Sequence, residues 1–260
     1  MRLAARFCTA AVLLCALCAD LYAQQNIISF SGYDWKIKSS GSTKIGPGPN
    51  FYSRSPENVW VDDLGMLHLK IRPKDGRWYC SEVICNGKFG YGQYIFHLAS
   101  RVDKINENAV LGLFTWSDSQ EYAHREMEFE FSRWGNPHDI NAQCVIQPYE
   151  KEGNLRKFRV DLESDDSVYT FTWGKDVISF LGVQGDSIVP KMGRDVIIKW
   201  DYKKKGIPVP GDEKVRLNLW LYGGKPPSDS REVEVIVKKF EFIPQTSHEQ
   251  EKEASSRWKR

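Results

Sequence analysis

The stretch that decides the fold class is HREMEFEFSRWG, residues 124–135. Because side chains alternate across a β-strand, one face of this stretch carries three carboxylates, Glu126, Glu128 and Glu130. The other face carries only methionine and phenylalanine. The stretch therefore predicts an all-β chain in which this strand turns an apolar face toward a core and an acidic face away from it.

Two explanations fit the acidic face. An ordinary solvated strand also alternates apolar and polar side chains, and glutamate is a common exposed residue. However, glutamate is disfavoured in strands and three like charges on one face repel one another, so a solvated strand would more readily carry threonine or mixed charges. The composition of the face therefore favours a functional site.

The spacing of the outer two glutamates suits chemistry at a glycosidic bond. At about 3.3 Å per residue, Glu126 and Glu130 are rooted about 13 Å apart, and two side chains that lean inward can bring their carboxyls across a single bond. Such a pair is typical of glycosidases, provided that the face is concave and open.

Length and composition predict one well-cored domain. The chain has 260 residues, of which 41% are hydrophobic and 13% aromatic. Its 36 basic and 34 acidic residues are interspersed, so nothing indicates a nucleic acid or an anionic membrane surface as the partner. Nine tryptophans and eleven tyrosines suit sugar rings as well as a core. We expect a monomer.

The N-terminus reads as a signal peptide of residues 1–23. Arg2 and Arg6 form a basic segment, residues 7–17 form an apolar one, and Ala23 ends a plausible cleavage site. The apolar run is too short to cross a bilayer, so we expect no membrane insertion. We expect a secreted, periplasmic or cell-surface protein, with a lipid anchor at Cys18 as a lesser alternative.

The rest of the chain reads as many short alternating runs separated by glycine, proline, asparagine and aspartate. This pattern predicts a two-sheet antiparallel β-sandwich in residues 24–244, followed by a disordered polar tail in residues 245–260. The expected strands are 59–61 and 66–72, joined as a hairpin, then 91–102, 110–116, 124–132, 141–149, 156–162, 168–173, 177–183, 196–202, 215–222 and 232–242.

Three cysteines remain after the expected cleavage: Cys80, Cys85 and Cys144. An odd number allows at most one internal disulfide, and a pair between Cys80 and Cys85 is one possibility. Three buried thiols without a disulfide are the other. No cysteine or histidine cluster has zinc spacing, and no nucleotide-binding loop or nucleophile elbow occurs, so we expect no metal and no cofactor.

The order of segments resembles glycoside hydrolase family 16, which comprises retaining endo-glycanases of lichenase, laminarinase, agarase and xyloglucan-transferase type. The resemblance covers residues 31–244. Its landmarks are residues 52–59 (YSRSPENV), 80–82 (CSE), 90–94 (GYGQY), 126–130 (EMEFE) and 218–220 (NLW). The resemblance implies a concanavalin A-like β-jelly roll with a concave cleft.

Carried over by position, the resemblance implies Glu126 as the nucleophile and Glu130 as the general acid/base of a retaining hydrolase that needs no metal. The catalytic strand of the family reads Glu-x-Asp-x-Glu, so Glu128 stands where the family has aspartate. A second departure is Ile84, which occupies the place of a substrate-binding arginine in lichenase-like members. The resemblance also implies a polysaccharide substrate of β-glucan type.

Further residues are candidates for binding sugar. Trp220 matches the Asn-x-Trp strand of the family and Asn218 shares its face, so these two suit ring stacking and hydroxyl binding. Core or edge packing is the alternative for each tryptophan, and an ordinary solvated face is the alternative for the glutamines. The complete set of predicted binding residues is Trp220, Asn218, Trp116, Trp134, Glu82, Gln143 and Gln147.

Three hypotheses follow for the function. The first is a secreted retaining endo-β-glycanase, or a transglycosylase of the same mechanism. The second is a non-catalytic glycan-binding jelly roll in which the changes at Glu128 and Ile84 report lost catalysis. The third is a structural surface protein with no glycan partner.

Overall fold

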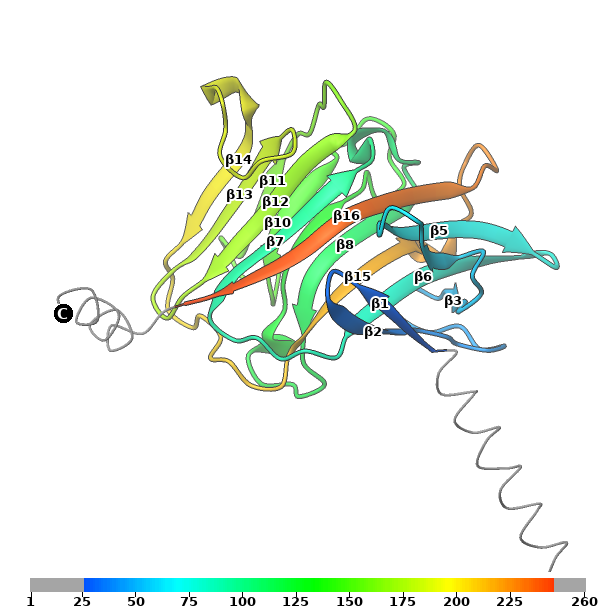
Figure 1. Cartoon of the computed structure of the whole chain (residues 1–260), viewed down its shortest axis with the longest axis horizontal. Coiled ribbons are helices and arrows are strands. Elements are labelled where there is room, and N and C mark those ends of the chain that lie inside the picture. Colours follow the sequence, from blue (N-terminus) through cyan, green and yellow to red (C-terminus); the bar gives the residue numbers. More distant parts are fainter. Residues whose placement is uncertain (1–25, 246–260) are drawn as a thin grey trace, which may run out of the picture.

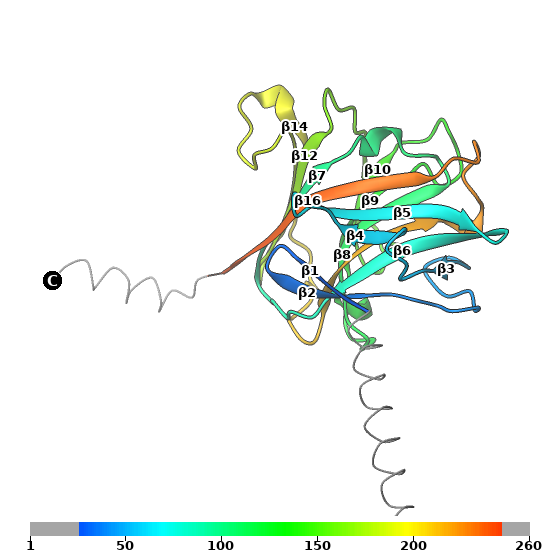
Figure 2. The same cartoon turned by 45° about the vertical axis from the view of Figure 1, so that its right-hand side comes forward.

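The computed structural model describes residues 26–245 (Figure 1). The expected signal peptide and all but the first residue of the expected polar tail lie outside these residues. The described chain folds into two layers of β-sheet that lie face to face (Figures 1 and 2). The all-β sandwich predicted from the sequence is confirmed, and it is the jelly roll that the resemblance implied.

One layer, called the cleft sheet below, carries the acidic face of the glutamate strand. Its strands, in spatial order, are β1 (Ile27–Phe30), β2 (Tyr33–Ile37), β6 (Arg77–Cys85), β15 (Lys214–Leu221), β8 (Ala109–Trp116), β9 (Met127–Phe131), β10 (Ala142–Ile146) and β11 (Leu155–Phe158). The short strand β3 (Phe51–Tyr52) lies parallel to β6, whereas every other strand pair in the described chain is antiparallel.

The other layer is called the back sheet. Its strands, in spatial order, are β4 (Val59–Val61), β5 (Leu67–Lys74), β16 (Val233–Pro244), β7 (Gly92–Ala99), β12 (Asp166–Trp173), β13 (Ile178–Gln184) and β14 (Val196–Tyr202). The β5–β6 hairpin joins the two sheets along one edge, where Arg72 pairs with Tyr79. Four short 3-10 turns complete the described chain: η1 (Val102–Lys104), η2 (Ala123–Arg125), η3 (Gly193–Asp195) and η4 (Tyr222–Gly224).

The core lies between the two sheets, and the glutamate strand contributes to it as predicted. Met127, Phe129 and Phe131 of β9 are each 0% exposed. The ring of Phe129 lies 5.3 Å from that of Tyr169 on β12 and 5.2 Å from that of Phe180 on β13. The apolar half of the alternating pattern is thus buried against the back sheet, which leaves the acidic half facing outward.

The strand predictions were incomplete in two places. β1, β2, β3 and β6 were not predicted, although β6 carries Glu82. The glutamate strand was expected from His124, but β9 begins at Met127 because the four residues 122–125 adopt positive φ, which no β-strand accommodates. Glu126 itself has extended backbone angles (φ −88°, ψ 119°) and leads directly into the strand.

Cys80, Cys85 and Cys144 are all buried and form no disulfide, which is the second of the two alternatives left open by the sequence. Burial raises the pKa of the Cys80 thiol to about 12 and that of Cys85 to about 11, so both remain protonated and unreactive at neutral pH.

No helix within residues 26–245 is long and apolar enough to cross a membrane.

Candidate active site

The register of the cleft sheet brings distant parts of the chain into one row across its outer face. Glu82 of β6 pairs with Asn218 of β15, and Asn218 pairs with Gly112 of β8. Gly112 pairs with Glu130 of β9, which in turn pairs with Gln143 of β10. Residues opposite one another in neighbouring strands point to the same face, so this row forms the floor of the site.

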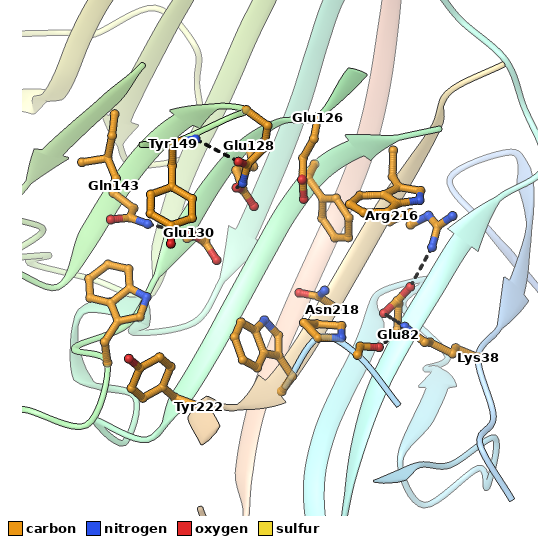
Figure 3. Close-up of a pocket in the computed structure, with 18 of the residues that line it drawn as sticks. Lys38, Glu82, Glu126, Glu128, Glu130, Gln143, Tyr149, Arg216, Asn218 and Tyr222 are labelled. Carbon is orange, nitrogen blue, oxygen red and sulfur yellow. Dashed lines mark hydrogen bonds and ion pairs between the residues drawn. The ribbon is translucent and has the colours of Figure 1, made fainter. Parts of the chain in front are cut away.

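A cleft of about 770 Å³ opens over this row. Figure 3 shows Glu126, Glu128 and Glu130 directed into it from the same side, with Arg216 and Glu82 beyond Glu126. The structure brings all ten residues predicted for the site into the lining of this one cleft: Glu82, Trp116, Glu126, Glu128, Glu130, Trp134, Gln143, Gln147, Asn218 and Trp220.

Burial raises the pKa of all three carboxyls. The pKa of Glu126 rises to about 8, first through burial and then through the charges of Glu130 and Glu82, while the cation of Arg216 opposes the rise. The pKa of Glu128 lies well above the usual range because the side chain is buried beside Glu130 and Glu126. Burial also raises the pKa of Glu130. The cleft therefore favours proton retention among its carboxyls, as a general acid requires.

Two glutamines fix the direction of two of the carboxyls. Gln143 donates a hydrogen bond from Nε2 to Oε2 of Glu130 at 2.7 Å, and Gln147 donates to Oε1 of Glu128 at 3.3 Å. Both bonds favour the ionised carboxyl and so counter the effect of burial on its pKa. The sequence had offered these amides as partners for sugar hydroxyls. In the structure the amide nitrogens bond the carboxyls, and both glutamines lie in the cleft lining.

Glu82 holds two cations at one end of the cleft. Its side chain is 1% exposed and lies 2.6 Å from Nζ of Lys38 and 3.4 Å from Nη1 of Arg216. Nη2 of Arg216 also lies 3.2 Å from Oδ1 of the exposed Asp118. The buried carboxylate is therefore compensated by charge, and it places Arg216 between itself and Glu126 (Figure 3).

Arg216 supplies a guanidinium to the cleft. It lies next to Ile84, the position at which the sequence suggested that an arginine was missing. The lichenase-like pattern led us to expect no such donor, because Ile84 occupies the place of the arginine. Arg216 pairs directly with Ile84 across the β6–β15 ladder. It also shares the strand face of Asn218 and Trp220, so alternation along β15 was the signal that could have identified it.

Aromatic side chains line much of the cleft. Trp116, Trp134 and Trp220 lie there as predicted, and they are joined by residues that the sequence reasoning missed: Phe114, Tyr149 and Tyr222. Phe114 shares strand parity with Trp116 on β8, whereas Tyr222 lies in η4 and Tyr149 in the loop after β10. The predicted strands 215–222 and 141–149 gave Tyr222 the parity of Trp220 and Tyr149 the parity of Gln147. Aromatic faces of this kind stack on the apolar faces of sugar rings.

Two residues near the glutamate strand take structural positions. The ring of His124 stacks on that of Trp116 with centroids 4.1 Å apart, and its Nδ1 donates to the carbonyl of Ser117 at 3.0 Å. Arg133 donates to the carbonyl of Ile105.

Within residues 26–245, no group of three or more histidine, cysteine, aspartate or glutamate side chains is arranged to hold a metal ion.

Solved structures of glycosidases share this fold. The β-glucanase of Bacillus licheniformis superposes with a TM-score of 0.59 at 16% identity, over 81% of this chain and 92% of that chain. A lichenase from a mouse hindgut metagenome gives 0.54 at 19% identity, over 81% and 93%. A glycosidic hydrolase gives 0.58 at 21% identity, over 85% and 95%.

These likenesses show the fold: the chain is a β-jelly roll of the kind found in β-glucanases and lichenases. No protein-family profile and no curated protein sequence matches the chain. The particular activity of this chain therefore has to be argued from its own cleft.

Proposed function

We propose that this protein is a retaining endo-β-glycanase that is exported by its N-terminal signal peptide and hydrolyses a β-glucan-type polysaccharide. The observation that carries the proposal is the convergence of Glu126, Glu128 and Glu130 on one open cleft with aromatic side chains in its lining. The structures that share the fold include a β-glucanase and a lichenase, which supports the same class of substrate.

In this proposal the reaction is a double displacement. Glu126, in its ionised form, attacks the anomeric carbon while Glu130 donates its proton to the glycosidic oxygen, so that the leaving sugar departs as an alcohol. Glu130, now ionised, then takes a proton from water, and the resulting hydroxide displaces Glu126 from the sugar. The positive charge of Arg216 favours the ionised form of Glu126 that the first step needs.

Glu128 and Gln143 serve the reaction indirectly. Glu128 keeps a proton because of its burial, so it adds little negative charge between the two reacting carboxyls. Gln143 holds Glu130 at 2.7 Å and leaves its other oxygen for the substrate. Trp220 and Tyr222 line the cleft where sugar rings can stack.

A non-catalytic glycan-binding protein is the second candidate. The observation that favours it is Glu128, whose longer side chain replaces the aspartate of the resembling family and is held by Gln147 at 3.3 Å. A small misplacement of a nucleophile can cost on the order of a hundredfold in rate. Tight glycan binding without turnover would identify this second function.

The deciding experiment is a turnover assay on β-1,3-, mixed-linkage and marine β-glycans. We expect the mature protein to hydrolyse at least one of them, and Glu126→Gln and Glu130→Gln each to lower kcat/KM by about a thousandfold or more. Glu232→Gln is the matched control, because Glu232 pairs with Lys70 and Arg72 of the back sheet and should leave the rate unchanged. NMR of the first-formed anomer should show retention.

Absence of turnover on every glycan by the parent protein would contradict the proposal. Calorimetry on the same glycans would then separate the second candidate from a structural role without a glycan partner.

A further inference from the structure

The segment that leads into Glu126 has an unusual backbone. Residues 122–125 all have φ in the left-handed region: 52° at Tyr122, 49° at Ala123, 66° at His124 and 53° at Arg125. None of the four is glycine, and left-handed backbone is unfavourable for residues with a Cβ atom. Four in succession persist only if their surroundings hold them, and such backbone is concentrated at functional sites.

Main-chain bonds attach this left-handed turn to the end of β8. The amide of Ser117 donates to the carbonyl of His124 at 2.7 Å, and the hydroxyl of Thr115 donates to the carbonyl of Arg125 at 2.7 Å. The stacking of His124 on Trp116 adds a side-chain contact with a residue of the cleft lining. These contacts fix one side of the turn.

The other side is fixed by the side chain of Arg125, which is 7% exposed. Its Nε donates to the carbonyl of Val209 at 2.8 Å and lies 4.0 Å from Oε2 of Glu213. Its Nη2 donates to Oε2 of Glu121 at 2.6 Å. Glu213 is itself buried and accepts a hydrogen bond from the amide of Gly211 at 2.7 Å. The guanidinium therefore docks in the loop of residues 207–213, which precedes β15.

Gly211 leaves the space that the guanidinium occupies. A Cβ atom at Gly211 would lie 2.8 Å from both Cζ and Nε of Arg125. The backbone of Gly211 is not left-handed, so φ is no obstacle to a side chain there, but a Cβ atom would require the guanidinium of Arg125 to shift. The contact set of Arg125, Val209, Gly211 and Glu213 is called the Arg125 clamp below.

We propose that Arg125 is a positioning residue for Glu126, because the Arg125 clamp fixes the left-handed turn and with it the direction in which Glu126 enters the cleft. The inference rests on the proposed function, in which Glu126 is the nucleophile. The adjoining turn also supports Trp116, so the clamp orients one wall of the cleft together with the nucleophile. None of the residues of the Arg125 clamp lines the cleft, so the clamp acts on the reaction only through Glu126.

The sharpest test is Gly211→Ala, which adds one methyl group against the guanidinium and changes no charge. We expect kcat to fall about tenfold or more with KM changed less than twofold, because the nucleophile is misaimed while the binding surfaces remain. Gly193→Ala is the matched control: Gly193 also lacks positive φ, and no atom lies within 4 Å of its added Cβ. The control should retain the parental kcat.

A second variant removes the clamp without leaving a buried charge unpaired. In Arg125→Met/Glu213→Gln both partners become neutral and keep their approximate shape. NMR titration of the glutamate carboxyls should show a lower pKa for Glu126 in this variant and in Gly211→Ala, because a loosened turn admits water to the carboxyl. If the double variant does not fold, Gly211→Ala decides alone.

The two proposals fail in different ways. If the parent protein turns over no glycan, the proposed function is wrong, yet the titration of Glu126 still decides whether the clamp positions it. If the parent is active, and Gly211→Ala keeps both its kcat and its Glu126 titration, the positioning role is wrong. Equal losses in Gly211→Ala and Gly193→Ala would also overturn it.

Discussion

Glu128 stands between the two carboxyls that are proposed to do the chemistry, and its side chain is 6% exposed. Burial and two neighbouring carboxyls raise its pKa well above the usual range, while Gln147 supplies the one hydrogen bond that favours ionisation. The raised pKa favours the protonated, neutral form of this residue. In that form it separates Glu126 from Glu130 without adding a negative charge of its own to the cleft.

The raised pKa of Glu128 predicts a pH-dependent stability. Below about pH 4.5 the carboxyl is protonated in both folded and unfolded chains, so its contribution to folding is fully present. As the pH rises, the unfolded chain ionises first, and the folded state loses stability until the folded pKa is passed. Glu128→Gln removes this loss, so its unfolding free energy relative to the parent should rise between pH 4.5 and pH 8, by about 1.4 kcal/mol for each unit by which folding raises the pKa of Glu128.

Urea unfolding of the parent and of Glu128→Gln at both pH values checks this prediction. Glu232→Gln, on the back sheet and 43% exposed, is the control and should show the same difference from the parent at both pH values. Parallel pH profiles for the parent and Glu128→Gln would mean that Glu128 is ionised in the folded protein.

At the scale of strands, the floor of the cleft depends on one glycine of β8. Gly112 lies between Asn218 of β15 and Glu130 of β9 in the row across the sheet. A Cβ atom at Gly112 would lie 2.5 Å from Oδ1 of Asn218. That oxygen accepts no hydrogen bond from the part of the chain that the structure describes. The absence of a side chain at Gly112 thus makes room for the buried amide oxygen of Asn218, a residue that lines the cleft.

Gly112→Ala should therefore displace Asn218 and weaken glycan binding about tenfold, since a polar contact to a sugar hydroxyl is lost. The affinity of the variant is measured by calorimetry. Because the methyl group acts through the amide, Asn218→Ala should cost about the same, and the double variant should cost little more than either one. Additive losses in this double-mutant cycle would show that Gly112 and Asn218 act independently.

The strands also show what the sequence could and could not predict. Alternation along β9 predicted both the core face and the cleft carboxyls, because a period of two depends on backbone geometry alone. The same rule applied to β15 would have added Arg216. It could not add Lys38, which follows β2 and lies in the cleft lining, where it pairs with Glu82. The left-handed turn of residues 122–125 was missed because tertiary contacts, not local residue preferences, hold it.

On the scale of the whole molecule, a jelly roll gives each of its two sheets one core face and one outer face. The predicted site residues all lie at the outer face of the cleft sheet. The back sheet carries an aromatic residue of its own, Trp60 on β4, whose ring stacks on His68 at 4.4 Å. The two tryptophans Trp60 and Trp220 are both half-buried, so a count of surface aromatics does not tell which sheet binds a glycan.

The back sheet has a hollow of about 340 Å³ at Trp60, whereas the cleft has about 770 Å³ and contains the three carboxyls. This difference predicts that the cleft sheet alone binds the polysaccharide. Trp220 lies in the cleft beside the carboxyls, whereas one side of Trp60 is occupied by His68 and Lys70 lies near its ring. In a Glu126→Gln background, Trp220→Ala should weaken glycan binding at least tenfold through loss of ring stacking. Trp60→Ala removes the same side chain from the opposite sheet and should leave the affinity within a factor of two. Affinity electrophoresis in gels containing glycan measures both, and circular dichroism confirms that each variant is folded. An equal loss in the two variants would place a second binding surface on the back sheet, and a loss in Trp60→Ala alone would move the glycan site away from the carboxyls altogether.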